Sequence, residues 1–146
     1  WCFTFITGHC DYGCDEFNSH LIFGVKMNIL LISLGAVMGA LLRWGIGLVL
    51  NPLFSSVALG TLIANWLGCF LIGIAMGLSL GENQKLLFIT GFLGSFTTFS
   101  SFSAELSEKL LIGKYGEAAF TLGLHLLGGV LLTILGIWLT QMLTQS

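Results

Sequence analysis

The chain has 146 residues, of which 55% are hydrophobic and only 8% are charged, with a formal net charge of −2 and a mean hydropathy of +0.96. A soluble domain carries roughly a quarter charged residues, so this chain has too few ionised side chains to cover a water-exposed surface. The composition indicates a one-domain integral membrane protein in a lipid bilayer, and the lack of any basic run argues against a nucleic-acid partner.

Residues 1–26 differ from the rest of the chain. They hold three of the four cysteines and two of the three histidines, namely Cys2, Cys10, Cys14, His9 and His20. Their spacing matches no zinc-binding pattern well, and Met27 opens a clean apolar segment. We expect residues 1–26 to be an N-terminal extension outside the functional domain, which then covers residues 27–146.

Four apolar segments follow Met27, at about 28–50, 57–80, 84–112 and 116–141. Each is close to or longer than the roughly 20 residues that a helix needs to cross the hydrocarbon core. Short connections make neighbouring segments antiparallel, and the shorter alternating segments of a membrane barrel are missing. The pattern predicts an all-α integral membrane protein with four transmembrane helices.

The basic residues give no clear direction of insertion. Lys26 and Lys85 belong to one side of the membrane, whereas Lys109 and Lys114 belong to the other, with Arg43 leaning toward them. Insertion in both orientations and a weak bias resolved by the insertion machinery both stay open. Because four short spans make too thin a bundle to enclose a path, we expect an oligomer.

Small residues recur at intervals of four along the first two spans. The rows are Gly35 and Gly39; Gly60, Ala64 and Gly68; and Gly73 and Gly77. Small residues at this interval line one helix face and let two backbones approach closely. The rows predict tight helix contacts, either within one chain or between copies.

The stretch GFLGSFTTFSSFSAE, at 91–105, is the most unusual part of the chain. It sets hydroxyl side chains among aromatic rings inside an apolar span: Thr97, Thr98, Ser100, Ser101 and Ser103 among Phe96, Phe99 and Phe102. Non-helical backbone at membrane depth persists only where protein or a water-filled cavity covers it. The stretch predicts a break in the third helix, with hydroxyls and ring edges facing something polar.

Other polar groups lie within or beside the spans. Asn65 can donate hydrogen bonds to an anion or bridge two helices, and Arg43 can attract an anion or extend to the interface. Glu105 can guard a pore mouth or mark the wet end of the third span. Four residues share one face of the fourth span, as a conduit lining or as interhelical hydrogen-bonding groups: Thr121, His125, Gly129 and Thr133.

These groups together suggest a narrow anion path. Aromatic rings have a positive edge, so Phe99 and Phe102 can line an anion's route, while the half-helix ends at a break supply free N–H groups. Plain aromatic packing in a membrane core is the alternative.

Three segments resemble the Fluc (CrcB-type) fluoride channel family: GAVMGALLRW at 35–44, GTLIANWLGCFLIG at 60–73 and GFLGSFTTFSSFSAE at 91–105. The resemblance covers residues 27–146, in order and at the family's spacing. It implies passive exit of fluoride from the cell, which lowers its cytoplasmic concentration, through a channel in the bacterial plasma membrane.

The resemblance also implies an assembly and a set of site residues. The assembly is an antiparallel, dual-topology homodimer with two fluoride pores and a central structural Na⁺, held by the backbone carbonyls of Gly94 and Thr97. The residues implied for the fluoride pathway are Asn65, Phe99, Phe102, Arg43, Ser100, Thr98, Thr121, His125 and Glu105. The imidazole of His125 departs from the neutral groups expected at that place.

Two rivals belong to other classes of protein. A small dual-topology, proton-coupled multidrug exporter needs a carboxylate in the middle of span one, and that segment holds no acid. An intramembrane hydrolase using Ser100 or Ser101 with His125 lacks the G-x-S-x-G motif. We therefore expect a channel and not an enzyme.

Overall fold

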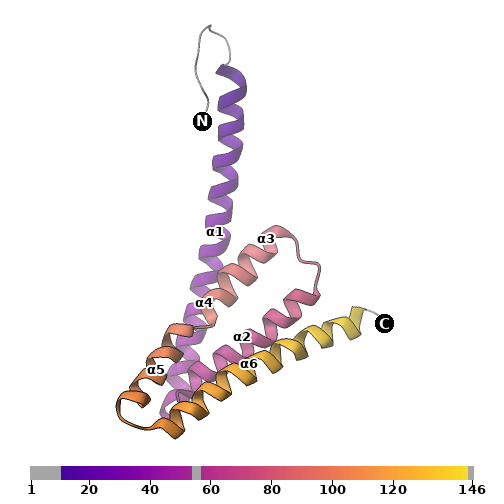
Figure 1. Ribbon diagram of the computed structural model, residues 1–146. Helices are drawn as coiled ribbons and strands as arrows, with labels where there is room; N and C mark the ends of the chain where they lie inside the picture. Colours follow the sequence, from indigo (N-terminus) through magenta and orange to yellow (C-terminus); the bar gives the residue numbers. More distant parts are fainter. Residues whose placement is uncertain (1–10, 54–56, 145–146) are drawn as a thin grey trace, which may run out of the picture.

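The computed structural model describes the backbone of residues 11–53 and 57–144, and side chains from Gly24 onward within those ranges (Figure 1). The elements, in chain order, are α1 (Asp11–Leu50), the 3₁₀ turn η1 (Asn51–Leu53), α2 (Leu59–Gly77), α3 (Glu82–Gln84), the π-helical η2 (Lys85–Leu93), α4 (Gly94–Phe96), α5 (Phe99–Leu111) and α6 (Tyr115–Thr144). All regular structure in these described ranges is helical.

Four helical segments are long and apolar enough to cross a membrane: Gly24–Leu53, Leu59–Gly77, Glu82–Leu111 and Tyr115–Thr144. The prediction of an all-α, four-span membrane protein is therefore confirmed. The second helix ends three residues before the expected position 80, because the backbone becomes extended at Leu78 (φ −96°, ψ 142°).

The first helix does not begin at Met27. Helix α1 runs without interruption from Asp11, through the end of the predicted extension and into the first span (Figure 1). Cys2, His9 and Cys10 lie outside the described residues, and the side chains of Cys14 and His20 lie outside the described side chains. The division at residue 26 stays a prediction.

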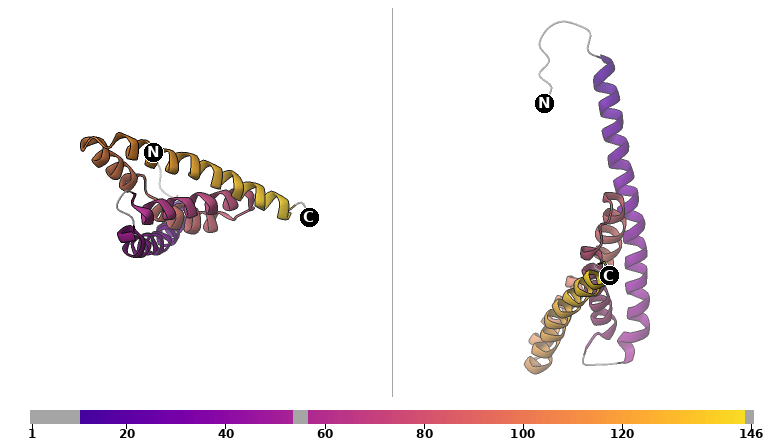
Figure 2. Two further views of the ribbon diagram at one scale, coloured as in Figure 1. Left: turned by 90° about the horizontal axis from the view of Figure 1, so that it is seen from below. Right: turned by 90° about the vertical axis from the view of Figure 1, so that its right-hand side faces the viewer.

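Two lengthwise contacts organise the helices. Helix α1 packs along η2 and α4, and α2 packs along α6, which runs beside it through most of its length (Figures 1 and 2). The rows of small residues make these contacts possible. A Cβ added at Gly35 would collide with the carbonyl oxygen of Leu87 in η2, and one at Gly73 would collide with that of Thr133 in α6. The predicted close contacts thus lie within one chain.

Polar side chains connect α2 and α6 as well. Trp66 Nε1 donates to the carbonyl of Leu124 at 3.0 Å, and Thr133 Oγ1 donates to the carbonyl of Cys69 at 3.1 Å. Interhelical hydrogen bonds in membranes contribute roughly 0.6 kcal/mol each on average. Thr133, from the predicted polar face of the fourth span, therefore serves interhelical bonding.

The third span is broken at the predicted place. Helix α4 ends at Phe96, Thr97 (φ −83°, ψ 151°) and Thr98 (φ −146°, ψ 117°) are extended, and α5 begins at Phe99. Two adjacent β-branched residues favour extended backbone. The hydroxyl of Thr98 then caps α5 by accepting from the N–H of Ser101 at 3.3 Å.

Candidate functional site

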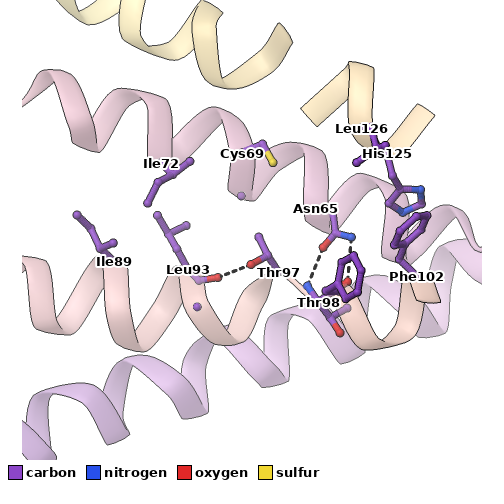
Figure 3. A pocket seen from close by; sticks show the side chains of 13 residues that line it. Asn65, Cys69, Ile72, Ile89, Leu93, Thr97, Thr98, Phe102, His125 and Leu126 are labelled. Carbon is purple, nitrogen blue, oxygen red and sulfur yellow. Dashed lines mark hydrogen bonds between the residues drawn. The ribbon is translucent and has the colours of Figure 1, made fainter. Parts of the chain in front are cut away.

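A cavity of about 370 Å³ lies beside the break, where α2, the η2–α4 segment, α5 and α6 meet (Figure 3). Seven of the predicted site residues line it: Asn65, Gly94, Thr97, Thr98, Phe99, Phe102 and His125. The remaining described lining is apolar or glycine, apart from Cys69, and the described lining contains no Asp, Glu, Lys or Arg. The cavity thus offers neutral polar groups in an apolar wall.

Asn65 holds the break open. Its Nδ2 donates to the carbonyl of Thr98 at 3.1 Å, and its Oδ1 accepts from the N–H of Thr98 at 2.7 Å (Figure 3). The side chain therefore bridges two helices and replaces the helical partners that Thr98 has lost. A primary amide has two N–H groups, so one donor on Asn65 is left for a ligand in the cavity.

Two phenylalanine rings mark the α5 side of the cavity. The rings of Phe99 and Phe102 meet edge to face, with centroids 5.6 Å apart and an interplanar angle of 64°. Phe102 is 4% exposed, whereas Phe99 is 76% exposed. In a single copy of the chain, Phe102 belongs to the wall and Phe99 stands at an open rim.

His125 lies against Phe102, with ring centroids 4.5 Å apart and the ring planes tilted by 32° (Figure 3). Its Nδ1 lies 3.1 Å from the carbonyl oxygen of Thr121. Because a carbonyl only accepts, Nδ1 is the protonated nitrogen of this pair. Nε2 is buried and has no hydrogen-bond partner among the described residues.

Glu105 lies on α5 and is not part of the cavity lining. Its Oε1 accepts from the N–H of Ala58, the residue that precedes α2, at 3.0 Å, and from Lys109 Nζ at 2.5 Å. Lys109 also donates to the hydroxyl of Thr121 at 2.7 Å. A carboxylate near a helix N-terminus is favourable, so Glu105 fastens α5 to the start of α2.

Sequence reasoning missed Lys109 as part of this site and used it only to mark one side of the membrane. The available signal was its position four residues after Glu105, which places both side chains on one helix face. Its second partner, Thr121, is 12 residues away and on another helix, so no local pattern indicates it.

Arg43 and Ser100 are not brought into the cavity lining. Arg43 Nε donates to the carbonyl of Ser95 at 3.2 Å, and its side chain lines a separate hollow of about 430 Å³ with Thr61 and Ser101. Ser100 shares a hydrogen bond of 3.0 Å with the hydroxyl of Thr98. Arg43 therefore supports the turn before the break from the α1 side.

The backbone at the break has carbonyls suited to a hard cation. In a continuous helix the N–H of Thr98 would bond to the carbonyl of Gly94, but here Asn65 takes that N–H. The carbonyl of Thr97 likewise loses a helical donor, because the N–H of Ser101 bonds to the side chain of Thr98. Carbonyls of unwound membrane helices are ligands that Na⁺ accepts, so the predicted pair fits the chemistry of such a site.

Four spans, a break in the third and a neutral polar cavity beside that break define a multi-pass membrane protein built like a channel or transporter. The family described as "CrcB-like protein, Camphor Resistance (CrcB)" matches residues 30–137. The chain belongs to this family, which confirms the resemblance drawn from the three motifs.

Relatives of the chain carry the name fluoride-specific ion channel FluC. The protein of Haemophilus ducreyi is 59% identical over 111 residues, which cover 76% of this chain and 90% of the relative. That of Haemophilus influenzae strain PittGG is 49% identical over 122 residues (80% and 95%), and that of Pasteurella multocida is 48% identical over 120 residues (79% and 94%).

Proposed function

We propose that this protein is a fluoride-specific ion channel that passively exports fluoride and lowers its cytoplasmic concentration, protecting the cell against fluoride toxicity. The observation that carries the proposal is the 59% identity, over 90% of its length, to a relative named for that activity. The multidrug-exporter alternative is not favoured by these relatives. An exporter of that class would need a carboxylate in the first span, and residues 24–50 contain no acid.

The cavity has the chemistry that passage of fluoride requires. A channel must replace the water lost by the ion yet hold it weakly enough to release it. The free N–H of Asn65, the hydroxyl of Thr98 and the positive edge of Phe102 are neutral groups that interact favourably with an anion. The described lining contains no Lys or Arg side chain, so its side chains stabilise the ion without trapping it.

A homodimer completes the path. The exposed rim at Phe99 leaves the cavity without a wall on one side of a single copy. A second copy packed across this rim would enclose the ring and the break. The balanced distribution of the basic residues supports an antiparallel, dual-topology pair, which we place in the bacterial plasma membrane.

The same assembly provides a sodium site. Each copy contributes the carbonyls of Gly94 and Thr97 at its break, so two copies provide four oxygen ligands to a structural Na⁺. A bound cation would fix the two breaks against each other. Asn65 keeps the carbonyl of Gly94 free of its helical bond, and the hydroxyl of Thr98 does the same for the carbonyl of Thr97.

Ion efflux from proteoliposomes tests the function. Vesicles carrying the full chain are loaded with potassium fluoride or potassium chloride, and release is started with a potassium ionophore and followed with ion-selective electrodes. We expect rapid fluoride release and chloride release at the rate of protein-free vesicles. The proposal would be overturned if vesicles with folded protein released fluoride no faster than protein-free vesicles, or if both halides were released at equal rates.

A further inference from the structure

Outside the cavity, Glu105 and Lys109 of α5 form a buried ion pair. We propose that Lys109 is a positioning residue for anion passage: it compensates the charge of Glu105 and holds that carboxylate away from the route of the anion. This inference rests on the proposed fluoride channel function.

The pair is buried in a way that the other ion pairs of the described chain are not. Lys109 is 7% exposed as a residue, and the side chains of Lys109 and Glu105 are 9% and 13% exposed. The neighbouring pair of Lys114 and Glu117, at 2.9 Å, has side chains 52% and 36% exposed. An exposed pair is screened and contributes little, whereas breaking a buried pair leaves an uncompensated charge.

A continuous series of contacts links Lys109 to the cavity. Its Nζ donates to the hydroxyl of Thr121, whose carbonyl oxygen lies against His125 Nδ1, and the imidazole packs against the ring of Phe102. Lys109 therefore contacts the polar face of α6 at Thr121, one helical turn before His125 of the cavity wall. A change in its position would move a group that the anion passes.

On its other side, Lys109 lines a second hollow of about 380 Å³. The ionisable lining of this hollow comprises three carboxylates and two ammonium groups, from Glu105, Glu108 and Glu117 and from Lys109 and Lys114. Its formal charge of −1 becomes −2 when Lys109 is neutralised. The ion pair thus separates an acidic hollow from the neutral cavity at the break.

The second carboxylate oxygen makes the charge of Glu105 consequential. Oε2 of Glu105 is buried and has no hydrogen-bond partner among the described residues. Only Oε1 is held, by Lys109 and by the N–H of Ala58. Without Lys109, a poorly compensated negative charge would stand next to Thr121, where it would repel an approaching anion.

Four variants of the full chain test this role in fluoride efflux from liposomes: K109Q, K109R, the double variant E105Q/K109Q, and K114Q. The last is the matched control, because it removes the same charge from the same hollow but from an exposed pair. Size-exclusion elution in detergent reports whether each variant assembles like the wild type.

We expect K109Q to release fluoride about tenfold more slowly or worse, a factor equal to about 1.4 kcal/mol. K109R should retain most of the rate, K114Q should stay within about twofold, and E105Q/K109Q should recover to within about threefold, since removing both charges restores the balance. The slow rate of K109Q should persist at 1 M salt, where the Debye length is about 3 Å, because a buried charge is poorly screened.

Three results would overturn the inference: wild-type efflux from K109Q, an assembled double variant as slow as K109Q, or a double variant that does not assemble. If K109Q alone fails to assemble, an assembled and active double variant still supports charge compensation. All of these outcomes require fluoride efflux from the wild type, so its absence would refute the proposed function separately.

Discussion

Replacement of Asn65 tests the central geometric claim, that one amide keeps the third helix open. The side chain makes both of its observed hydrogen bonds to Thr98, at 2.7 and 3.1 Å. N65A leaves the N–H and the carbonyl of Thr98 without these partners. Each unpaired buried group costs about 1–3 kcal/mol, and we take about 1 kcal/mol for each because both groups are only part-buried.

The consequence for the channel follows from the helix itself. Once released, the N–H of Thr98 can bond to the carbonyl of Gly94 and extend α4, which would occupy that carbonyl and rotate Phe99. A loss of about 2 kcal/mol lowers the population of the open break roughly 30-fold. We expect the fluoride efflux rate of N65A to fall by a similar factor.

A second substitution separates the clamp from contact with the ion. N65D keeps an acceptor for the N–H of Thr98 but loses the donor and adds a negative charge to a cavity with no charge in its described lining. N65D should therefore be more stable to heat than N65A in detergent but slower in fluoride efflux. Efflux from N65A within threefold of the wild type, with assembly intact, would refute the reasoning.

The other predictions concern the rings and the α2–α6 contact. Phe102→Ile and Phe99→Ile should each reduce fluoride efflux from liposomes while the elution volume of the assembled protein is unchanged; unchanged efflux from both would remove the rings from the pathway. Gly73→Ala should lower the thermal aggregation temperature, because the new Cβ would meet the α6 backbone, whereas Gly123→Ala should not, since nothing lies within 4 Å of its Cβ. Trp66→Phe removes one bond to an α6 carbonyl and should cost about 0.6 kcal/mol, measured by the same scan; a drop as large as that of the Gly73 variant would contradict this.

Sequence reasoning located the spans and the break because both depend on local chemistry. Twenty or more apolar residues can only cross the bilayer as a helix, and a run of hydroxyls and β-branched residues at membrane depth does not favour an uninterrupted one. The start of α1 was less accessible, because the cysteines, histidines and acids of residues 1–26 set them apart from the apolar span, yet the helix already begins at Asp11.

The partners of the polar groups could not be predicted in the same way. Asn65 and Thr98 are 33 residues apart, and Ala58 and Glu105 are 47 apart, so their pairing depends on how the helices pack. The residue types nevertheless limited the choices. A part-buried amide needs both a donor and an acceptor, and the unwound Thr98 supplies both.

The distribution of charge connects these contacts to conduction. Two charged groups contact the elements that surround the cavity: Arg43, which is bonded to the carbonyl of Ser95, and the Glu105–Lys109 pair on α5. Each is held outside the lining and is occupied by a partner of its own. Under the proposed function, an anion that crosses the break would therefore meet dipoles and ring edges and no Asp, Glu, Lys or Arg side chain of the described lining, which would allow it to leave as readily as it enters. Loosening either charge from its partner should impair flux more than removing any single hydroxyl, because a free charge would bind or repel the ion over a distance of several ångströms.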